Sequence, residues 1–129
     1  MATQEDVREI ALRLPGTVEG EGRFGFSVPV KGKYKGILWT WSERVHPKKP
    51  KVINEGVIAV VVPHLLVKDM LIATQPEYYF TEDHYNGFPA VLVKLEAIPV
   101  DELAALIEDA WRCKAPANLL AQFPKSDGG

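Results

Sequence analysis

Apolar residues near the start of the chain recur with the period of an α-helix. Thr3, three residues ahead of Asp6, predicts where this helix begins, because a hydroxyl and a carboxylate can satisfy the free backbone N–H groups of the first turn. Pro15 and Gly16 predict where the helix ends. Its apolar stripe, with the spacing i, i+3, i+4 and i+7, consists of Val7, Ile10, Ala11 and Leu14.

From residue 24 the period changes to two, which is the period of a β-strand. The segment 24–30 alternates apolar with small or polar residues, and a second alternating segment groups Ile37, Trp39 and Trp41. A glycine-bearing break at 31–33 lies between the two segments. We therefore expect a β-hairpin with one buried face and with lysines at or near its tip.

The next apolar segment, 56–63, shows no alternation and predicts a strand that is covered on both faces in the middle of a sheet. A polar, proline-bearing loop is expected before it, between Trp41 and Gly56. After it, the segment 64–76 predicts a short helix that ends at Pro76. This helix is apolar nearly all round, so it is either deeply packed or partly a contact surface.

The last third of the chain predicts a second hairpin and a long helix. Residues 78–80 are expected to form a short strand, the Asn-Gly pair at 86–87 a tight turn, and residues 90–95 the returning strand. A helix is predicted over 99–113, with acidic residues near its start and basic residues near its end. A short turn or helix is expected around 116–122.

The predicted order is helix, three strands, helix, short strand, strand, helix. Strands joined by hairpins are antiparallel, so the sequence predicts an α+β fold, an antiparallel sheet with helices packed on it. No internal repeat and no linker divides the 129 residues. We expect a single domain over residues 1–129, with a frayed tail at about 124–129.

Composition indicates the class of protein. The hydrophobic content of 47% and the charged content of 25% are ordinary for a globular domain. The single cysteine, Cys113, excludes an internal disulfide and fits a reducing cytoplasm. The N-terminal segment mixes charges among its apolar residues, unlike a signal peptide, and the longest apolar segments are too short to cross a bilayer. We expect a cytoplasmic protein with no membrane partner.

The net charge of −2 conceals a strong segregation of charge along the chain. Residues 31–51 hold seven basic residues and one acid, Glu43, a net +6, which leaves eight basic and sixteen acidic residues, a net −8, elsewhere. Such a segment can create a local positive field on an acidic body, or its lysines can simply solvate loops. The seven basic residues are Lys31, Lys33, Lys35, Arg44, Lys48, Lys49 and Lys51.

Motifs of enzymes and of metal or cofactor sites are weak in this chain. Residues 20–25 match G-x-G-x-x-G, but a helix is expected before them and a strand after them, the reverse of a dinucleotide site. His46, His64 and His84 lack the paired spacing of a zinc site. Cys113 is expected to pack as a small hydrophobe, and no local motif supports a Cys–His nucleophile. We expect no metal, no cofactor, no catalytic residue and no enzymatic activity.

Four segments resemble a known family, and together they cover nearly the whole chain. They are "LPGTVEG", "FSVPVKGKYKGILWTW", "TEDHYNGFPAVLVKL" and "DELAALIEDAWRCKAPANLLA". In this order they resemble the MmcQ/YjbR-like family, and "HYNGFPAVLV" and "DAWRCKAP" look like its two signatures. The resemblance implies a frataxin-like layout with a double-wing arrangement, and a DNA-binding role that rests on analogy between folds. The helix "HLLVKDMLIATQ" is less charged than the family leads us to expect.

Residues and resemblance together favour a non-catalytic DNA-binding protein of the MmcQ/YjbR type. The hairpin lysines would contact phosphates, which position a protein without reading bases. The segment "HYNGFP" is either a turn whose aromatic rings pack across a hairpin, or a second wing that presents donors and a ring to the partner. The residues expected at these contacts, besides the basic residues given above, are His84, Tyr85 and Asn86.

Two alternatives remain open at this point. The hairpin tip and the loop that carries Lys48, Lys49 and Lys51 are expected at opposite ends of the sheet, roughly 20 Å apart, so the basic segment can form two patches instead of one. The other class of function is a protein- or small-ligand-binding module, or a homo-oligomer, that uses the open sheet face or the apolar segment 65–72.

Overall fold

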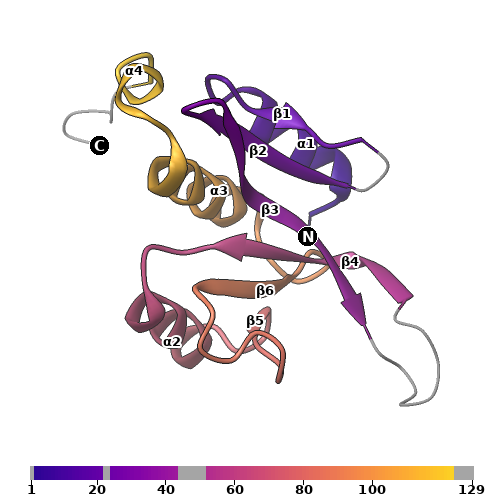
Figure 1. The fold of residues 1–129 in the computed structure, drawn as a ribbon. Helices are drawn as coiled ribbons and strands as arrows, with labels where there is room; N and C mark the ends of the chain where they lie inside the picture. The colour runs from indigo at the N-terminus through magenta and orange to yellow at the C-terminus, as the bar shows by residue number, and fades with distance from the viewer. Residues whose placement is uncertain (1, 22–23, 44–51, 124–129) are drawn as a thin grey trace.

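The computed structural model describes residues 2–21, 24–43 and 52–123, and its fold is shown in Figure 1. The elements follow the order that the periodicity predicts, with one additional strand before the first hairpin, and the short turn or helix expected around 116–122 is a helix. The elements are α1 (Gln4–Leu12), β1 (Val18–Glu19), β2 (Gly25–Val30), β3 (Lys33–Glu43), β4 (Val52–Val61), α2 (Leu65–Thr74), β5 (Tyr79–Phe80), β6 (Ala90–Lys94), α3 (Val100–Lys114) and α4 (Ala117–Leu120).

The strands form one antiparallel sheet in the order β1-β2-β3-β4-β6-β5. The predicted α+β class, an antiparallel sheet with helices packed on it, is confirmed. The segment without alternation is the C-terminal half of β4, which lies between β3 and β6 as expected for a central strand. The strands at the two edges, β1 and β5, have only two residues each.

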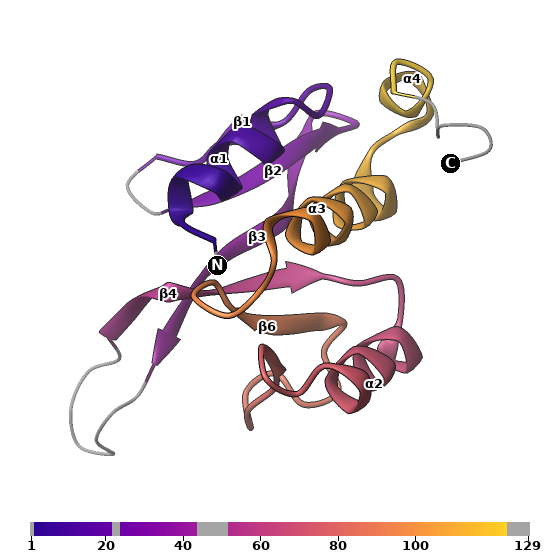
Figure 2. The same cartoon turned by 180° about the vertical axis from the view of Figure 1, so that it is seen from behind.

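Helices α1 and α3 cover one face of the sheet, which Figure 2 shows from the helical side. The capping box predicted for α1 is present, since Thr3 and Asp6 each accept a hydrogen bond from the other's backbone N–H group. In α3 one apolar side is buried, and Trp111 Nε1 on that side donates to the carbonyl oxygen of Pro15 at 2.9 Å. This bond ties α3 to the segment that follows α1.

The β2–β3 hairpin turns through two residues, Lys31 and Gly32, because Val30 pairs directly with Lys33. Their φ angles are 52° and 81°, the left-handed conformations that a type I′ turn requires at both central positions. Glycine adopts this conformation without strain, and its presence at the second position explains why the chain turns here. The predicted hairpin with lysines at its tip is confirmed.

The alternation in β3 is interrupted by a bulge that the sequence does not reveal. Phe26 pairs with Leu38 and Ser27 with Gly36, so Ile37 is an extra residue on β3. Both Ile37 and Leu38 are therefore buried in the core beneath the helices. Grouping Ile37 with the tryptophans that follow it was wrong, because the bulge moves these residues onto opposite faces.

The polar loop predicted between Trp41 and Gly56 was also too long. β3 continues to Glu43 and β4 begins at Val52, and the register shifts between Thr40 and Trp41. The β3–β4 hairpin is thus longer than alternation alone indicates. The basic residues predicted in this loop, Arg44, Lys48, Lys49 and Lys51, lie outside the described residues.

The Asn-Gly pair does not form a two-residue hairpin turn. Phe80 pairs with Leu92, so the connection between β5 and β6 includes a loop over residues 81–89. Within this loop the N–H group of Phe88 donates to the carbonyl oxygen of Tyr85 at 3.0 Å, and Gly87 has a φ of 78°. One residue with positive φ does not make a type I′ turn. A tight turn does occur at Asn86 and Gly87 as predicted, but it does not join the two strands directly, so the predicted hairpin was wrong in its length.

Two side chains differ in burial from what the sequence suggests. Cys113 is exposed, so its predicted role as a packed hydrophobe was wrong, and burial of part of its surface raises the pKa of its thiol. α2 is not deeply packed, because it exposes Leu65, Leu66 and Met70, and the side chain that it buries is the charged Lys68.

None of the helices in the described ranges combines the length and apolar content that a bilayer span requires.

Candidate functional site

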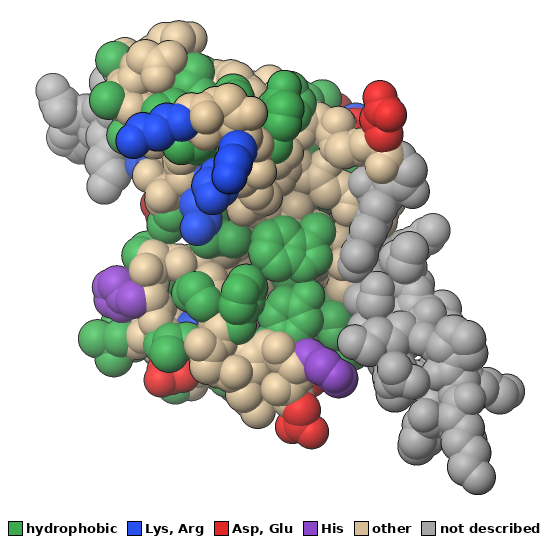
Figure 3. Space-filling model, in the orientation of Figure 1, with side chains coloured by type: hydrophobic (Ala, Val, Ile, Leu, Met, Phe, Trp, Pro, Cys, Tyr) green, Lys and Arg blue, Asp and Glu red, His purple; other side chains and the backbone are tan. Residues whose placement is uncertain are grey.

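The hairpin tip presents three lysines to solvent. Lys31, Lys33 and Lys35 are exposed, and within the described part of the chain none of them forms an ion pair or hydrogen bond. Tyr34 lies between two of them with 66% of its surface exposed. Basic side chains (blue) stand beside a green apolar area in Figure 3, which views the face of the sheet opposite α1 and α3. Unpaired ammonium groups at a turn can contact phosphates without a competing carboxylate.

The other predicted basic residues follow β3 in the sequence and lie outside the described residues. β3 runs for 11 residues from Lys33 at the tip to Glu43. At about 3.3 Å per residue, the segment that follows Glu43 starts roughly 33 Å from the tip. The tip lysines therefore lie at one end of β3, and Glu43 lies at the other.

The loop 81–89 has an exposed rim and a packed interior. His84 and Asn86 are exposed at the rim, where Glu82 accepts from the backbone N–H of His84 at 2.9 Å and lies 3.3 Å from its Nδ1. Thr81 Oγ1 donates to Asn86 Oδ1 at 3.3 Å. Tyr85 instead points inward, and its hydroxyl accepts from Trp39 Nε1 at 3.0 Å. The loop thus combines both interpretations: a ring packed on the sheet and polar groups at the surface.

Lys68 holds this loop in place, and the sequence analysis missed it. Only 3% of Lys68 is exposed, and its Nζ donates to the carbonyl oxygens of Tyr85 and of Phe88, the latter at 2.9 Å. Burial lowers the pKa of its ammonium group, and Asp69 opposes that shift. A lysine within an otherwise apolar helix was the available signal, because burying an ammonium requires hydrogen-bond acceptors.

An apolar area rich in rings occupies the face of the sheet opposite α1 and α3. Trp39 pairs with Ala59, Ala59 with Leu92, and Leu92 with Phe80, so these four residues form one row across four strands. We call this area the aromatic face and define it by its rings, which are half-buried apart from the more exposed Phe88. They are Trp39, Trp41, Phe80, Tyr85 and Phe88.

The rings of the aromatic face meet edge to face. Trp41 and Phe80 have centroids 5.6 Å apart at 80°, and Tyr85 and Phe88 have centroids 6.0 Å apart at 82°. Trp39 meets Phe88 at 6.4 Å and 63°. Lys94 adds a cation, with its Nζ 5.6 Å from the centroid of Phe80. In a T-shaped pair the edge of one ring points at the face of the other, so the face of the ring that supplies the edge is not covered by this neighbour.

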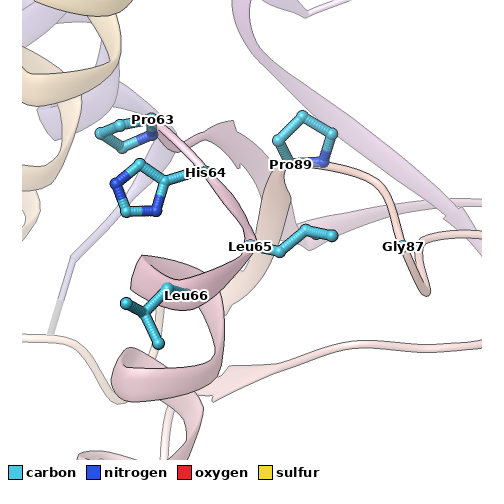
Figure 4. A pocket seen from close by; sticks show the side chains of 6 residues that line it. All are labelled: Pro63, His64, Leu65, Leu66, Gly87 and Pro89. Carbon is cyan, nitrogen blue, oxygen red and sulfur yellow. The ribbon is translucent and has the colours of Figure 1, made fainter.

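A shallow apolar pocket lies at the end of this face, between the start of α2 and the loop 81–89 (Figure 4). Its volume is about 580 Å³. His64 is the one titratable side chain among its lining residues. Across residues 2–21, 24–43 and 52–123, no three histidine, cysteine, aspartate or glutamate side chains lie close enough to hold a metal ion. The lining residues are Pro63, His64, Leu65, Leu66, Gly87 and Pro89.

Two tyrosines share one carboxylate between the sheet and α3. Tyr78 Oη donates to Glu102 Oε1 at 2.6 Å, and Tyr79 Oη donates to Glu102 Oε2 at 2.7 Å. Burial, followed by the hydrogen bond and charge of Glu102, raises the pKa of Tyr78 to about 12. The same causes, in the same order, raise the pKa of Tyr79. These hydroxyls stay protonated and act as donors that fasten β5 to α3.

Alkaline pH is therefore expected to destabilise the protein through these tyrosines. In the unfolded chain both hydroxyls ionise near about pH 10, whereas the folded protein retains their protons. Their contribution to stability is complete below about pH 10 and is lost as the pH rises towards about 12. Urea denaturation at a series of alkaline pH values measures this decline. A variant with Tyr78→Phe and Tyr79→Phe should decline less steeply, and an equal decline would contradict the assignment.

Comparison with known structures identifies a fold neighbour. The crystal structure of the Deinococcus radiodurans protein DR2400, a DUF419 domain, superposes with a TM-score of 0.68 and covers 100% of this chain and 95% of that one. The two sequences are 18% identical, so the likeness shows the fold alone.

Comparison of sequences identifies relatives. No family model matches the chain. The uncharacterized proteins Rv2570 of Mycobacterium tuberculosis and Mb2600 of Mycobacterium bovis are each 32% identical to it over 136 residues, which cover 99% of this chain and 100% of theirs. At this identity and coverage, the chain belongs to the same family as these uncharacterized mycobacterial proteins.

Proposed function

We propose that the protein is a non-catalytic DNA-binding domain of the MmcQ/YjbR type, in which the β2–β3 hairpin contacts backbone phosphates. The observation that carries the proposal is the cluster of three exposed lysines, Lys31, Lys33 and Lys35, with no acidic partner among the described residues. An unpaired cationic tip on a protein of net charge −2 concentrates positive potential in one place. DUF419, the domain of the fold neighbour, is related to the MmcQ/YjbR family, which agrees with this proposal.

The loop 81–89 supplies the second contact in this proposal. His84 and Asn86 lie exposed at its rim, and both carry groups that hydrogen-bond to phosphate or sugar oxygens. The loop is held by Lys68 and by the bond between Trp39 and Tyr85. Its shape is thus set before any partner arrives, which reduces the entropy lost on binding.

A fluorescence-anisotropy titration tests the proposal with labelled duplex and single-stranded DNA at several salt concentrations. Three lysine–phosphate contacts should give log K against log salt a slope of about −2.7 on a duplex. The variant Lys33→Thr/Lys35→Thr should weaken binding by at least about tenfold at about 100 mM salt and reduce the slope to about −0.9. Threonine suits a strand, and leaving Lys31 in place preserves the turn.

The matched control for this experiment is Arg13→Glu, which changes the net charge by the same amount as the lysine variant. Arg13 lies at the end of α1, on the helical side of the sheet, where its only described ion pair is with Glu9 at 3.8 Å. Binding should change little in the control. Absence of binding to either form of DNA at low salt, or equal weakening by the two variants, would overturn the proposal.

The second candidate function is a protein- or small-ligand-binding module. The observation in its favour is the apolar surface at the start of α2, where Leu65, Leu66 and Met70 are exposed beside the pocket of about 580 Å³. An exposed apolar area of this kind is unusual on a monomer and is typical of interaction surfaces.

A further inference from the structure

Most of the core lies on the helical side of the sheet, and the aromatic face carries a second, smaller cluster. The main core cluster lies beneath α1 and α3, whereas Val57, Ala59 and Leu92 form a separate small cluster on the aromatic face. In the described part of the chain no helix lies over this second cluster (Figure 1). Figure 3 shows the face as a hollow lined by apolar side chains (green) between two thicker parts of the molecule. A surface of this composition is available to a partner.

The rings of the aromatic face cover a small buried floor of the sheet. Ala59, the smallest side chain in the row across the sheet, stands directly between Trp39 and Leu92. Gly36 lets the indole lie close to the backbone of β3, since a Cβ atom there would already contact the Trp39 ring at 3.4 Å. Trp39 and Phe80 are three strands apart, so their Cα atoms are separated by about 14 Å, and Ala59 and Leu92 between them are fully buried beneath the rings. A planar group can therefore contact the exposed parts of the rings, and not the strands beneath them.

The charges around the aromatic face indicate which kind of partner fits it. Lys94 lies over Phe80, and Lys31 lies at the tip of the hairpin whose strand β3 carries Trp39. At the rim, Glu82 is already engaged by His84, while Asp83 is exposed. Positively charged side chains therefore predominate between the rings and the hairpin tip. A partner that offers planar rings joined by a chain of negative charges complements this arrangement.

We infer that the aromatic face binds unpaired bases of a single-stranded nucleic acid, while the hairpin lysines hold its phosphates. Base faces stack on aromatic side chains with little regard to sequence, and a basic groove follows the backbone. A duplex keeps its base faces inside its own stack, so it can use only the lysines. The inference rests on the proposed function and adds the class of nucleic acid and the surface that recognises the bases.

Titration of tryptophan emission tests the inference without a label. Trp39 and Trp41 lie on the aromatic face, and Trp111 is fully buried and supplies an unchanging background. The ligands are fifteen-nucleotide oligo-dT, oligo-U of the same length, a duplex of the same length, and an abasic oligonucleotide with the same phosphates. Oligo-dT should quench the emission and bind at least about tenfold more tightly than the abasic strand. Comparison with oligo-U shows whether DNA or RNA is preferred.

Two variants separate the rings from the rest of the surface. Phe88→Ala removes a ring of the aromatic face that is 45% exposed, and it should weaken binding of oligo-dT several-fold while leaving the abasic strand unaffected. Leu66→Ala is the matched control, since it removes an apolar side chain that is 64% exposed on α2, outside the face. If that control alone weakened binding, α2 and not the aromatic face would carry the bases.

Different experimental outcomes would contradict this inference and the proposed function. If the duplex and the abasic strand bind as tightly as oligo-dT and tryptophan emission does not change, the inference is overturned and phosphate binding by the lysines stands. If no nucleic acid binds at low salt, both are overturned. Quenching by an apolar peptide in the absence of any response to oligo-dT would identify the face as a protein-binding surface and would also overturn the inference.

Discussion

Replacing Glu102 with alanine is expected to lower the free energy of unfolding by about 3 kcal/mol. The substitution removes the acceptor of two hydrogen bonds, and each bond to a charged group contributes about 1.5–3 kcal/mol. It also leaves the hydroxyls of Tyr78 and Tyr79 buried without this partner. Equilibrium denaturation by urea measures the loss. Glu102→Gln retains one acceptor oxygen and should cost less.

A double-mutant cycle distinguishes this pairing from a general effect on α3. In the background Tyr78→Phe/Tyr79→Phe the hydroxyls are absent, so adding Glu102→Ala should cost less than about 1 kcal/mol. Glu102 is half-buried at the first turn of α3, where a carboxylate also gains a few tenths of a kcal/mol from the helix dipole. Equal costs in the two backgrounds would show that the tyrosines are not the reason for the effect.

Replacing Lys68 with methionine is expected to lower the free energy of unfolding by about 2 kcal/mol. Methionine preserves most of the apolar stem but removes the donor to the carbonyl oxygens of Tyr85 and Phe88. Each carbonyl keeps one backbone bond, from Phe88 and Ala90 respectively, so neither becomes fully unpaired. Relief from burying an ammonium offsets part of the loss, which is why the expected cost is below that of two charged hydrogen bonds.

The same variant should loosen the loop 81–89 while leaving the rest of the sheet intact. Hydrogen exchange is expected to quicken at the backbone amides of Tyr85, Phe88 and Ala90, whose bonds form the turn that Lys68 fastens. Lys114→Met, at the end of α3, is the control for removing a lysine elsewhere. Unchanged stability and unchanged exchange in Lys68→Met would show that the loop is held by its own turns.

Local patterns account for most of the fold. The helical stripe of α1, the glycine at the β2–β3 turn and the unbroken apolar segment of β4 each lie within one short window of sequence, and each predicts its element correctly. The bulge at Ile37 escaped prediction because it depends on how two strands pair. The Asn-Gly pair misled because its usual turn is overridden by a larger loop that Lys68 anchors.

The candidate site is less visible in the sequence because it is assembled from distant segments. Trp39 and Tyr85 are 46 positions apart, and no local pattern joins them. Lys68 reaches the loop from a helix whose apolar residues define no single face, so periodicity cannot show where the lysine points. The lysine tip was predicted because all of its residues belong to one hairpin. The aromatic face was not predicted, because the bulge at Ile37 decides on which face of the sheet the tryptophans after it lie.

The two-residue strands at the edges of the sheet have a consequence for solubility. Exposed strand edges are templates on which other chains add, and this is how sheet proteins join into fibres. β5 offers two residues for such growth, and the part of β2 that extends beyond β1 contains Pro29, which has no N–H group to donate. The molecule can therefore keep an apolar surface exposed without adding further molecules through its strand edges.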